Sequence, residues 1–109
     1  MPFGLTEETI HQIQLVFQQF HQMEEAVVYG SRAKGNDKPG SDIDLVLKGQ
    51  ELNLQVLNAI SLKLDDLYLP YRFDLAIFHH INLAELLDHI RRVGKVFYRK
   101  PATEIAPEC

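Results

Sequence analysis

The chain has little of the material from which a disulfide framework or a membrane span is built. It contains a single cysteine, Cys109, so no disulfide can form within the chain. No apolar run is long enough to cross a bilayer, and the first residues lack the basic region and long apolar run of a signal peptide. We therefore expect a soluble, cytoplasmic protein without a membrane association.

Positive charge is also scarce. The 11 lysines and arginines are outnumbered by 15 aspartates and glutamates, which gives a formal net charge of −4. Proteins that bind long nucleic acids usually carry a basic stripe, whereas the basic residues here are scattered apart from a loose group at 91–100. Extended nucleic-acid binding is therefore not expected. A single nucleotide needs far less positive charge, so nucleotide binding stays open.

What the chain does contain is enough apolar material for one small domain. Apolar residues make up 46% of its 109 residues and charged residues 24%, as in ordinary globular proteins. We expect a single domain over residues 1–100 and a flexible tail over 101–109.

The spacing of the apolar residues predicts three helices and three strands. Apolar positions recur at helical spacing over 6–20, 52–67 and 82–93, with Thr6 and Asn82 as N-caps and Gly94 as the C′ residue after the last helix. Strands are predicted over 26–29, 42–48 and 71–78, with a helical turn at 31–35, a loop at 36–40 and a short extended piece at 95–98. This order predicts an α/β (α+β) fold in which helices pack on a small mixed sheet of three or four strands.

The connections between the predicted strands indicate how they pair. Strands 42–48 and 71–78 are joined through a helix, so we expect them to be parallel neighbours with a right-handed crossover. Strands 26–29 and 42–48 are joined by a compact loop, so an antiparallel pair is expected. That pairing would bring Gly30 and Ser31 beside Asp42.

Three aspartates fall on these strands in positions where they can meet. The strand period of two puts Asp42 and Asp44 on one face, about 6.6 Å apart along the chain, and an adjacent strand lies about 4.8 Å away. Asp74 is on that neighbouring strand, between Phe73 and Leu75. Carboxylates crowded together raise one another's pKa, and Mg²⁺, which prefers oxygen ligands, relieves that cost. The pattern predicts a magnesium site, with two ions about 3.5–4 Å apart as is usual in nucleotidyl transfer.

A Gly-Ser pair at the end of the first strand predicts a phosphate site. Gly30 lets another group approach the backbone, and Ser31 opens a helical turn whose N–H groups and hydroxyl can bind an anion. Arg32 and Lys34 either contact phosphate or are solvated loop charges, and the residues alone do not decide between the two. Tyr29 precedes the pair and either touches the nucleotide or packs.

The runs Gly30-Ser31-Arg32-Ala33-Lys34-Gly35 and Ser41-Asp42-Ile43-Asp44-Leu45 resemble the signature of the DNA polymerase beta-like nucleotidyltransferase superfamily. The resemblance extends from Ala26 to about Tyr98, and Asp74 matches the third carboxylate of that family. The length and the form of the motif are similar to the minimal nucleotidyltransferases (MNT) that pair with HEPN-domain proteins as antitoxin and toxin.

The resemblance implies a nucleotidyltransferase fold and a role for each of these residues. Gly30, Ser31, Arg32 and Ser41 would bind the nucleotide, while Asp42, Asp44 and Asp74 would be catalytic and would hold the metal. The implied reaction is a Mg²⁺-dependent transfer of a nucleoside monophosphate, AMP from ATP, to an acceptor hydroxyl on a HEPN-type toxin.

Two other functions remain open from the sequence. The chain could neutralise a partner by contact alone, with a regulatory nucleotide site, or it could modify a small molecule without a protein partner. A homodimer is compatible with the small size. The apolar stripe on the last predicted helix is wider than a small sheet needs, which is typical of a surface that meets a protein partner.

Overall fold

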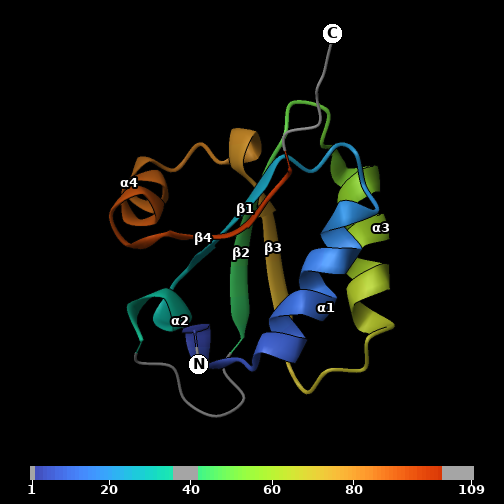
Figure 1. The fold of residues 1–109 in the computed structure, drawn as a ribbon. Coiled ribbons are helices and arrows are strands. Elements are labelled where there is room, and N and C mark those ends of the chain that lie inside the picture. Colours follow the sequence, from blue (N-terminus) through green and yellow to red (C-terminus); the bar gives the residue numbers. More distant parts are fainter. Residues whose placement is uncertain (1, 36–41, 102–109) are drawn as a thin grey trace, which may run out of the picture.

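The computed structural model describes residues 2–35 and 42–101 (Figure 1). The main elements are α1 Glu7–Gln18, β1 Glu25–Tyr29, α2 Ser31–Lys34, β2 Ile43–Lys48, α3 Leu54–Asp65, β3 Phe73–Ile77, α4 Ala84–Val93 and β4 Lys95–Arg99, with short 3-10 turns η1 at Pro2–Gly4 and η2 at Phe78–His80. Each predicted helix is longer than the observed one, in part because the chain leaves α1 and α3 through tighter turns such as Leu67 N–H to Leu64 O at 3.1 Å. The loop predicted at 36–40 lies outside the described residues, as does nearly all of the tail predicted at 101–109.

The four strands form one mixed sheet in the order β3-β2-β1-β4. β1 is antiparallel to β2, and β2 is parallel to β3, so both predicted pairings are confirmed. The extended piece predicted at 95–98 is β4, which pairs antiparallel with the other side of β1. The predicted fold class, a small mixed sheet with helices packed on it, is confirmed.

The helices divide unequally between the two faces of this sheet. In Figure 1, α1 and α3 lie together on one face, and α4 lies on the other. We call the first the covered face and the second the open face. Side chains of β2 alternate between them, with Ile43, Leu45 and Leu47 on the covered face and Asp44 and Val46 on the open face.

The covered face holds the main hydrophobic core. Its buried members come from every layer of the fold and include Leu5, Ile13, Phe17, Ala26, Val28, Ile43, Leu45, Leu47, Ile60, Leu64, Ile77 and Phe97. The open face has a much smaller cluster, in which Ile90 of α4 packs on Val27 and Val46. Most of the burial that stabilises the fold is therefore on the side away from Asp44.

Helix capping follows the sequence at one predicted position and departs from it at two. The Thr6 side chain accepts a hydrogen bond from Thr9 N, as an N-cap should. Asn82 does not cap α4, because the helix begins two residues later and Leu83 occupies the cap position. Gly94 is the C-cap in an extended conformation with φ −65°, not a left-handed C′ residue. A Cβ at Gly94 would contact Ile90 O and lie 2.7 Å from Val27 Cγ1, so glycine is needed there for close packing.

A β-bulge in β4 explains why two consecutive aromatic residues are buried. Ala26 pairs with Tyr98 but Val27 pairs with Val96, so Phe97 is an extra residue in β4. The bulge lets both Phe97 and Tyr98 join the core of the covered face, where the Tyr98 ring lies 5.5 Å from that of Phe17. Within the described ranges, no helix is both long and apolar enough to cross a bilayer.

Candidate active site

The turn after β1 brings the backbone against a carboxylate. Gly30 has φ +78°, a left-handed conformation that favours glycine, and α2 follows at once, with Lys34 N–H donating to Gly30 O at 3.2 Å. A Cβ added at Gly30 would collide with Asp44 Oδ2. Two separate features therefore require glycine at position 30: the left-handed backbone of the turn and the close approach of the turn to Asp44.

Asp44 and Asp74 face each other across the parallel pair of strands. They are Cα partners in the register of β2 and β3, and Tyr29 is the partner of Asp44 on β1. Burial raises the pKa of Asp44, and repulsion from the carboxylates of Asp74 and Asp42 and a hydrogen bond shared with Asp74 raise it further. The Arg32 guanidinium lowers the pKa of Asp44 as the smallest of these effects. The predicted meeting of these two acids is thus observed.

Asp42 stands apart from this pair. It lies one residue before β2, is exposed, and acts on Asp44 as a neighbouring charge. Across residues 2–35 and 42–101, no three His, Cys, Asp or Glu side chains are gathered closely enough to form a ready-made metal site. The structure therefore brings together two of the three predicted carboxylates, with the third close enough to interact electrostatically.

The donor set at this place suits a hard divalent cation. The carboxylates of Asp44 and Asp74 offer only oxygen ligands, the kind that Mg²⁺ prefers. A cation between them would also remove the repulsion that raises the pKa of Asp44. The residues present therefore fit a bound Mg²⁺.

Arg32 is buried, which contradicts one of the two roles that the sequence left open. Only 3% of its surface is exposed, so it is not a solvated loop charge. Its Nη1 donates to Phe3 O at 2.8 Å, and its guanidinium lies 4.9 Å from the centre of the Tyr71 ring. Arg32 thus ties the first residues of the chain to the turn beside Asp44. Lys34 is exposed at the end of α2.

The structure describes one predicted nucleotide ligand, Ser31, only in part, and it does not describe the other, Ser41. Ser31 begins α2, as the predicted helical turn requires, but its side chain is not among those described. Ser41 lies outside the described residues altogether.

Tyr29 is part of the site, a position that the sequence left open between packing and nucleotide contact. Burial raises the pKa of Tyr29 to about 12, with further contributions from the carboxylates of Asp74 and then Asp44. Its ring makes an edge-on contact with His89 of α4, with centroids 6.3 Å apart. Since Tyr29 is two residues beyond Val27 on β1, the strand period could have placed it on the open face from sequence alone.

Comparison with protein families shows the family to which this chain belongs. Residues 11–103 match the family model described as Polymerase beta, Nucleotidyltransferase. The chain belongs to this family. The matched range contains Gly30, Asp42, Asp44 and Asp74, and membership identifies the protein as a nucleotidyltransferase.

Solved structures share the nucleotidyltransferase fold at low sequence identity. A chain of a toxin–antitoxin crystal structure with AMP-PNP has a TM-score of 0.67 and 18% identity, over 88% of this chain and 75% of that one. A chain of the solved structure of the tri-AMPylated Shewanella oneidensis HEPN toxin in complex with MNT antitoxin has a TM-score of 0.66 and 14% identity. The match covers 88% of this chain and 74% of that one. A chain of the toxin–antitoxin MntA-HepT has a TM-score of 0.65 and 14% identity, over 87% and 74%. No curated protein matches the chain.

Proposed function

We propose that this nucleotidyltransferase uses Mg²⁺ and ATP to transfer AMP to a hydroxyl of a HEPN-type protein, and that it acts in this way as an antitoxin. The observation that carries the proposal is the pairing of Asp44 with Asp74 beside the Gly30 turn. Without a cation, the charged form of Asp44 is unfavourable, first because the carboxyl is partly buried and then because Asp74 and Asp42 are negative, and its pKa is raised accordingly. A pair kept in this arrangement is explained by a cation that binds there.

The Gly30 turn would hold the triphosphate. The backbone N–H groups at the start of α2 and the Ser31 hydroxyl are the donors proposed for the phosphate oxygens. Arg32 adds a fixed positive charge behind the turn, because its side chain is buried and bonded to Phe3 O. Ser41 is proposed as a further nucleotide ligand.

Asp42, Asp44 and Asp74 would hold the metal, two ions in the complete site. Bound Mg²⁺ would supply stabilisation of the charge that develops on the phosphate oxygens. In the transfer, the acceptor oxygen bonds to the α-phosphorus, the bond to the oxygen bridging the α- and β-phosphates breaks, and pyrophosphate leaves. Asp74, the more exposed of the paired acids, would accept the proton of the attacking hydroxyl.

A protein is the acceptor that agrees best with the structural neighbours. One of those structures is a complex of a tri-AMPylated HEPN toxin with an MNT antitoxin. Among the described residues, the open face has a much smaller hydrophobic cluster than the covered face and one long helix, α4 (Figure 1), so less of it is used in the packing of the chain itself.

The proposal is tested by mixing the chain with ATP labelled on the α-phosphate, Mg²⁺ and a HEPN-domain protein from the same genome. We expect label on the HEPN protein and a mass gain of one or more AMP units. The matched control is the Asp44→Asn, Asp74→Asn variant, which should leave the acceptor unmodified.

Two results would favour the other functions left open by the sequence. If the double variant still neutralised its partner, the chain would be a binding module and transfer would be incidental. Pyrophosphate release with a small hydroxyl compound and without protein would indicate a small-molecule nucleotidyltransferase.

A further inference from the structure

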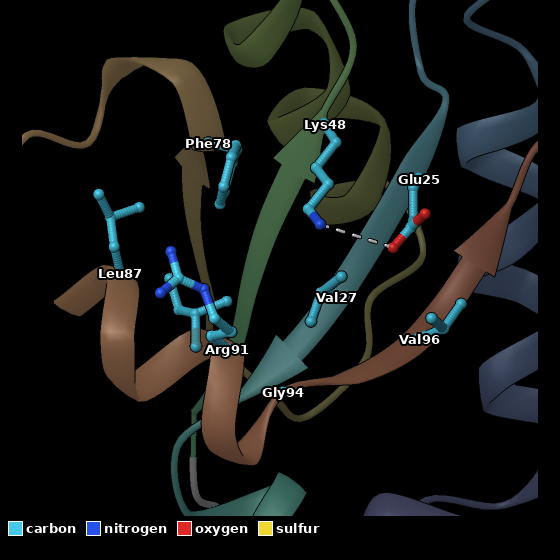
Figure 2. Close-up of a pocket in the computed structure, with 9 residues that line it drawn as sticks. Glu25, Val27, Lys48, Phe78, Leu87, Arg91, Gly94 and Val96 are labelled. Atoms are coloured by element: carbon cyan, nitrogen blue, oxygen red, sulfur yellow. Dashed lines mark ion pairs between the residues drawn. The ribbon is translucent and has the colours of Figure 1, made fainter.

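A groove of about 250 Å³ lies on the open face between α4 and the sheet (Figure 2). Val27 and Val96 come from the sheet, Leu87 and Ile90 come from α4, and Phe78 closes the end beyond β3. Val96 is 45% exposed even though it is an apolar residue in a strand. We call this hollow the α4 groove.

The charges around the α4 groove are mainly positive. Glu25 pairs with Lys48, whose Nζ lies 3.8 Å away (Figure 2). Arg99 Nε lies 3.6 Å from the same carboxylate, so the charge of Glu25 is already compensated. Arg91 lines the same groove, and within the described part of the chain it has no ion-pair partner. A cationic apolar hollow in a chain of net charge −4 favours an occupant that is apolar and acidic.

The outer side of α4 extends this surface. Leu87 and Arg91 are four residues apart in α4 and so share one side of the helix. Leu83, the N-cap residue, precedes Leu87 by four residues. Leu83 is 57% exposed. The stripe therefore continues the apolar surface of the groove and ends at a cation.

The α4 groove extends along the open face away from the paired acids. Its near end, at Val27, is two residues from Tyr29, which borders Asp44, and this step along β1 spans about 7 Å. Its far end, at Glu25, is four residues from Tyr29, a step of about 13 Å. A protein acceptor would cover both the acids and the whole length of the groove.

We propose that the α4 groove docks the acceptor protein, through a segment that presents an apolar side chain next to an Asp or Glu. The apolar side chain enters between Val27, Leu87 and Val96, and the carboxylate pairs with Arg91. This inference rests on the proposed function for its acceptor, but the docking itself requires neither Mg²⁺ nor ATP.

The test uses the full chain and a HEPN-domain protein from the same genome as the probe. Arg91→Glu should weaken binding of the HEPN protein at least tenfold by calorimetry and raise the KM for that protein similarly. The affinity for Mg-ATP should stay within twofold, because Arg91 lines the groove and is not one of the residues proposed to hold the metal or the nucleotide. Arg92→Glu is the matched control, since Arg92 is the next residue of α4 but pairs with Asp88 on the exposed surface. It should change neither value by more than twofold.

A second measurement locates the contact directly. A photo-cross-linking amino acid at Leu83 should capture the HEPN protein, and the same group at Leu62, which is 66% exposed on α3, should not. Equal capture at both positions, or unchanged binding by Arg91→Glu, would overturn the docking proposal. A wild-type chain that binds Mg-ATP but not the HEPN protein would also overturn it. Arg91-dependent binding without any transfer would uphold the docking and reject the proposed reaction.

Discussion

The two faces of the sheet differ in what their residues contribute. On the covered face, strand residues such as Ile43, Leu45 and Leu47 are fully buried beneath α1 and α3. On the open face, the neighbouring Asp44 is held against Asp74 and against the Gly30 turn at a cost in electrostatic energy. Successive side chains of a strand point to opposite faces of the sheet. Adjacent residues of β2 can therefore stabilise the core on one face and form the site on the other.

The largest effect should come from a cavity in the covered face. Leu45→Ala removes a side chain that is 0% exposed, and we expect a loss of about 2–5 kcal/mol in the free energy of unfolding. Urea denaturation measures this loss, with Leu54→Ala as the control because Leu54 is 62% exposed. Similar losses for both variants would mean that the covered face is not the main core.

The next effect should appear at the turn of the open face. Gly30→Ala places a Cβ against Asp44 Oδ2 at φ +78°, so we expect loss of Mg-ATP binding together with about 1–2 kcal/mol of strain. Gly35→Ala is a matched control, because Gly35 has φ +80° but no atom of the described residues lies within 4 Å of the added Cβ. It should carry the strain and still bind Mg-ATP. Equal binding by both variants would show that the contact with Asp44 is unimportant.

Neutralising Asp44 should have a smaller effect on stability, and it should stabilise the metal-free protein instead of destabilising it. Since the pKa of Asp44 is raised in the folded protein, the folded state holds this proton more tightly than the unfolded chain does. Stability therefore falls as pH rises through the ordinary carboxyl pKa towards the raised value, and the full cost persists above it. We expect Asp44→Asn to raise the Tm of the metal-free protein at pH 7 and to lose that advantage near pH 3. A variant with a lower Tm at pH 7 would contradict this account.

The smallest effect should come from the ion pair on the outer surface of α4. Arg92 Nε lies 2.9 Å from Asp88 Oδ2, but both side chains are more than half exposed. We expect Arg92→Ala to cost about 0.3–0.5 kcal/mol by urea denaturation, and less at high salt. If the free energy of unfolding fell by more than about 1 kcal/mol, the Arg92–Asp88 ion pair would stabilise α4 more than this account allows, and the packing of Ile90 on the sheet less.

Local patterns predicted the parts of the fold that depend on neighbouring residues. The strand period and the lengths of the connections gave the pairing of β2 with β1 and β3, and with it the meeting of Asp44 and Asp74. The burial of Arg32 could not be predicted in this way, because its partners are Phe3, far earlier in the chain, and Tyr71, far later.

Three other features also depended on tertiary structure. The bulge at Phe97 places the rings of Phe97 and Tyr98 against Phe17 of α1, far earlier in the chain. The observed helix cap is Asn53 and not Asn82. The α4 groove draws its residues from four separate stretches of the chain, so no single window of sequence contains it.

The proposed function requires the open face to bind a nucleoside triphosphate with magnesium through Asp44 and Asp74. Calorimetric titration of ATP into the purified chain, with and without Mg²⁺, measures this binding, beside the Asp44→Asn, Asp74→Asn variant. We expect Mg²⁺-dependent binding by the wild type and none by the variant, which should remain folded with an undiminished Tm. Binding that needs no Mg²⁺, or that survives in the variant, would show that these two acids do not hold a magnesium nucleotide.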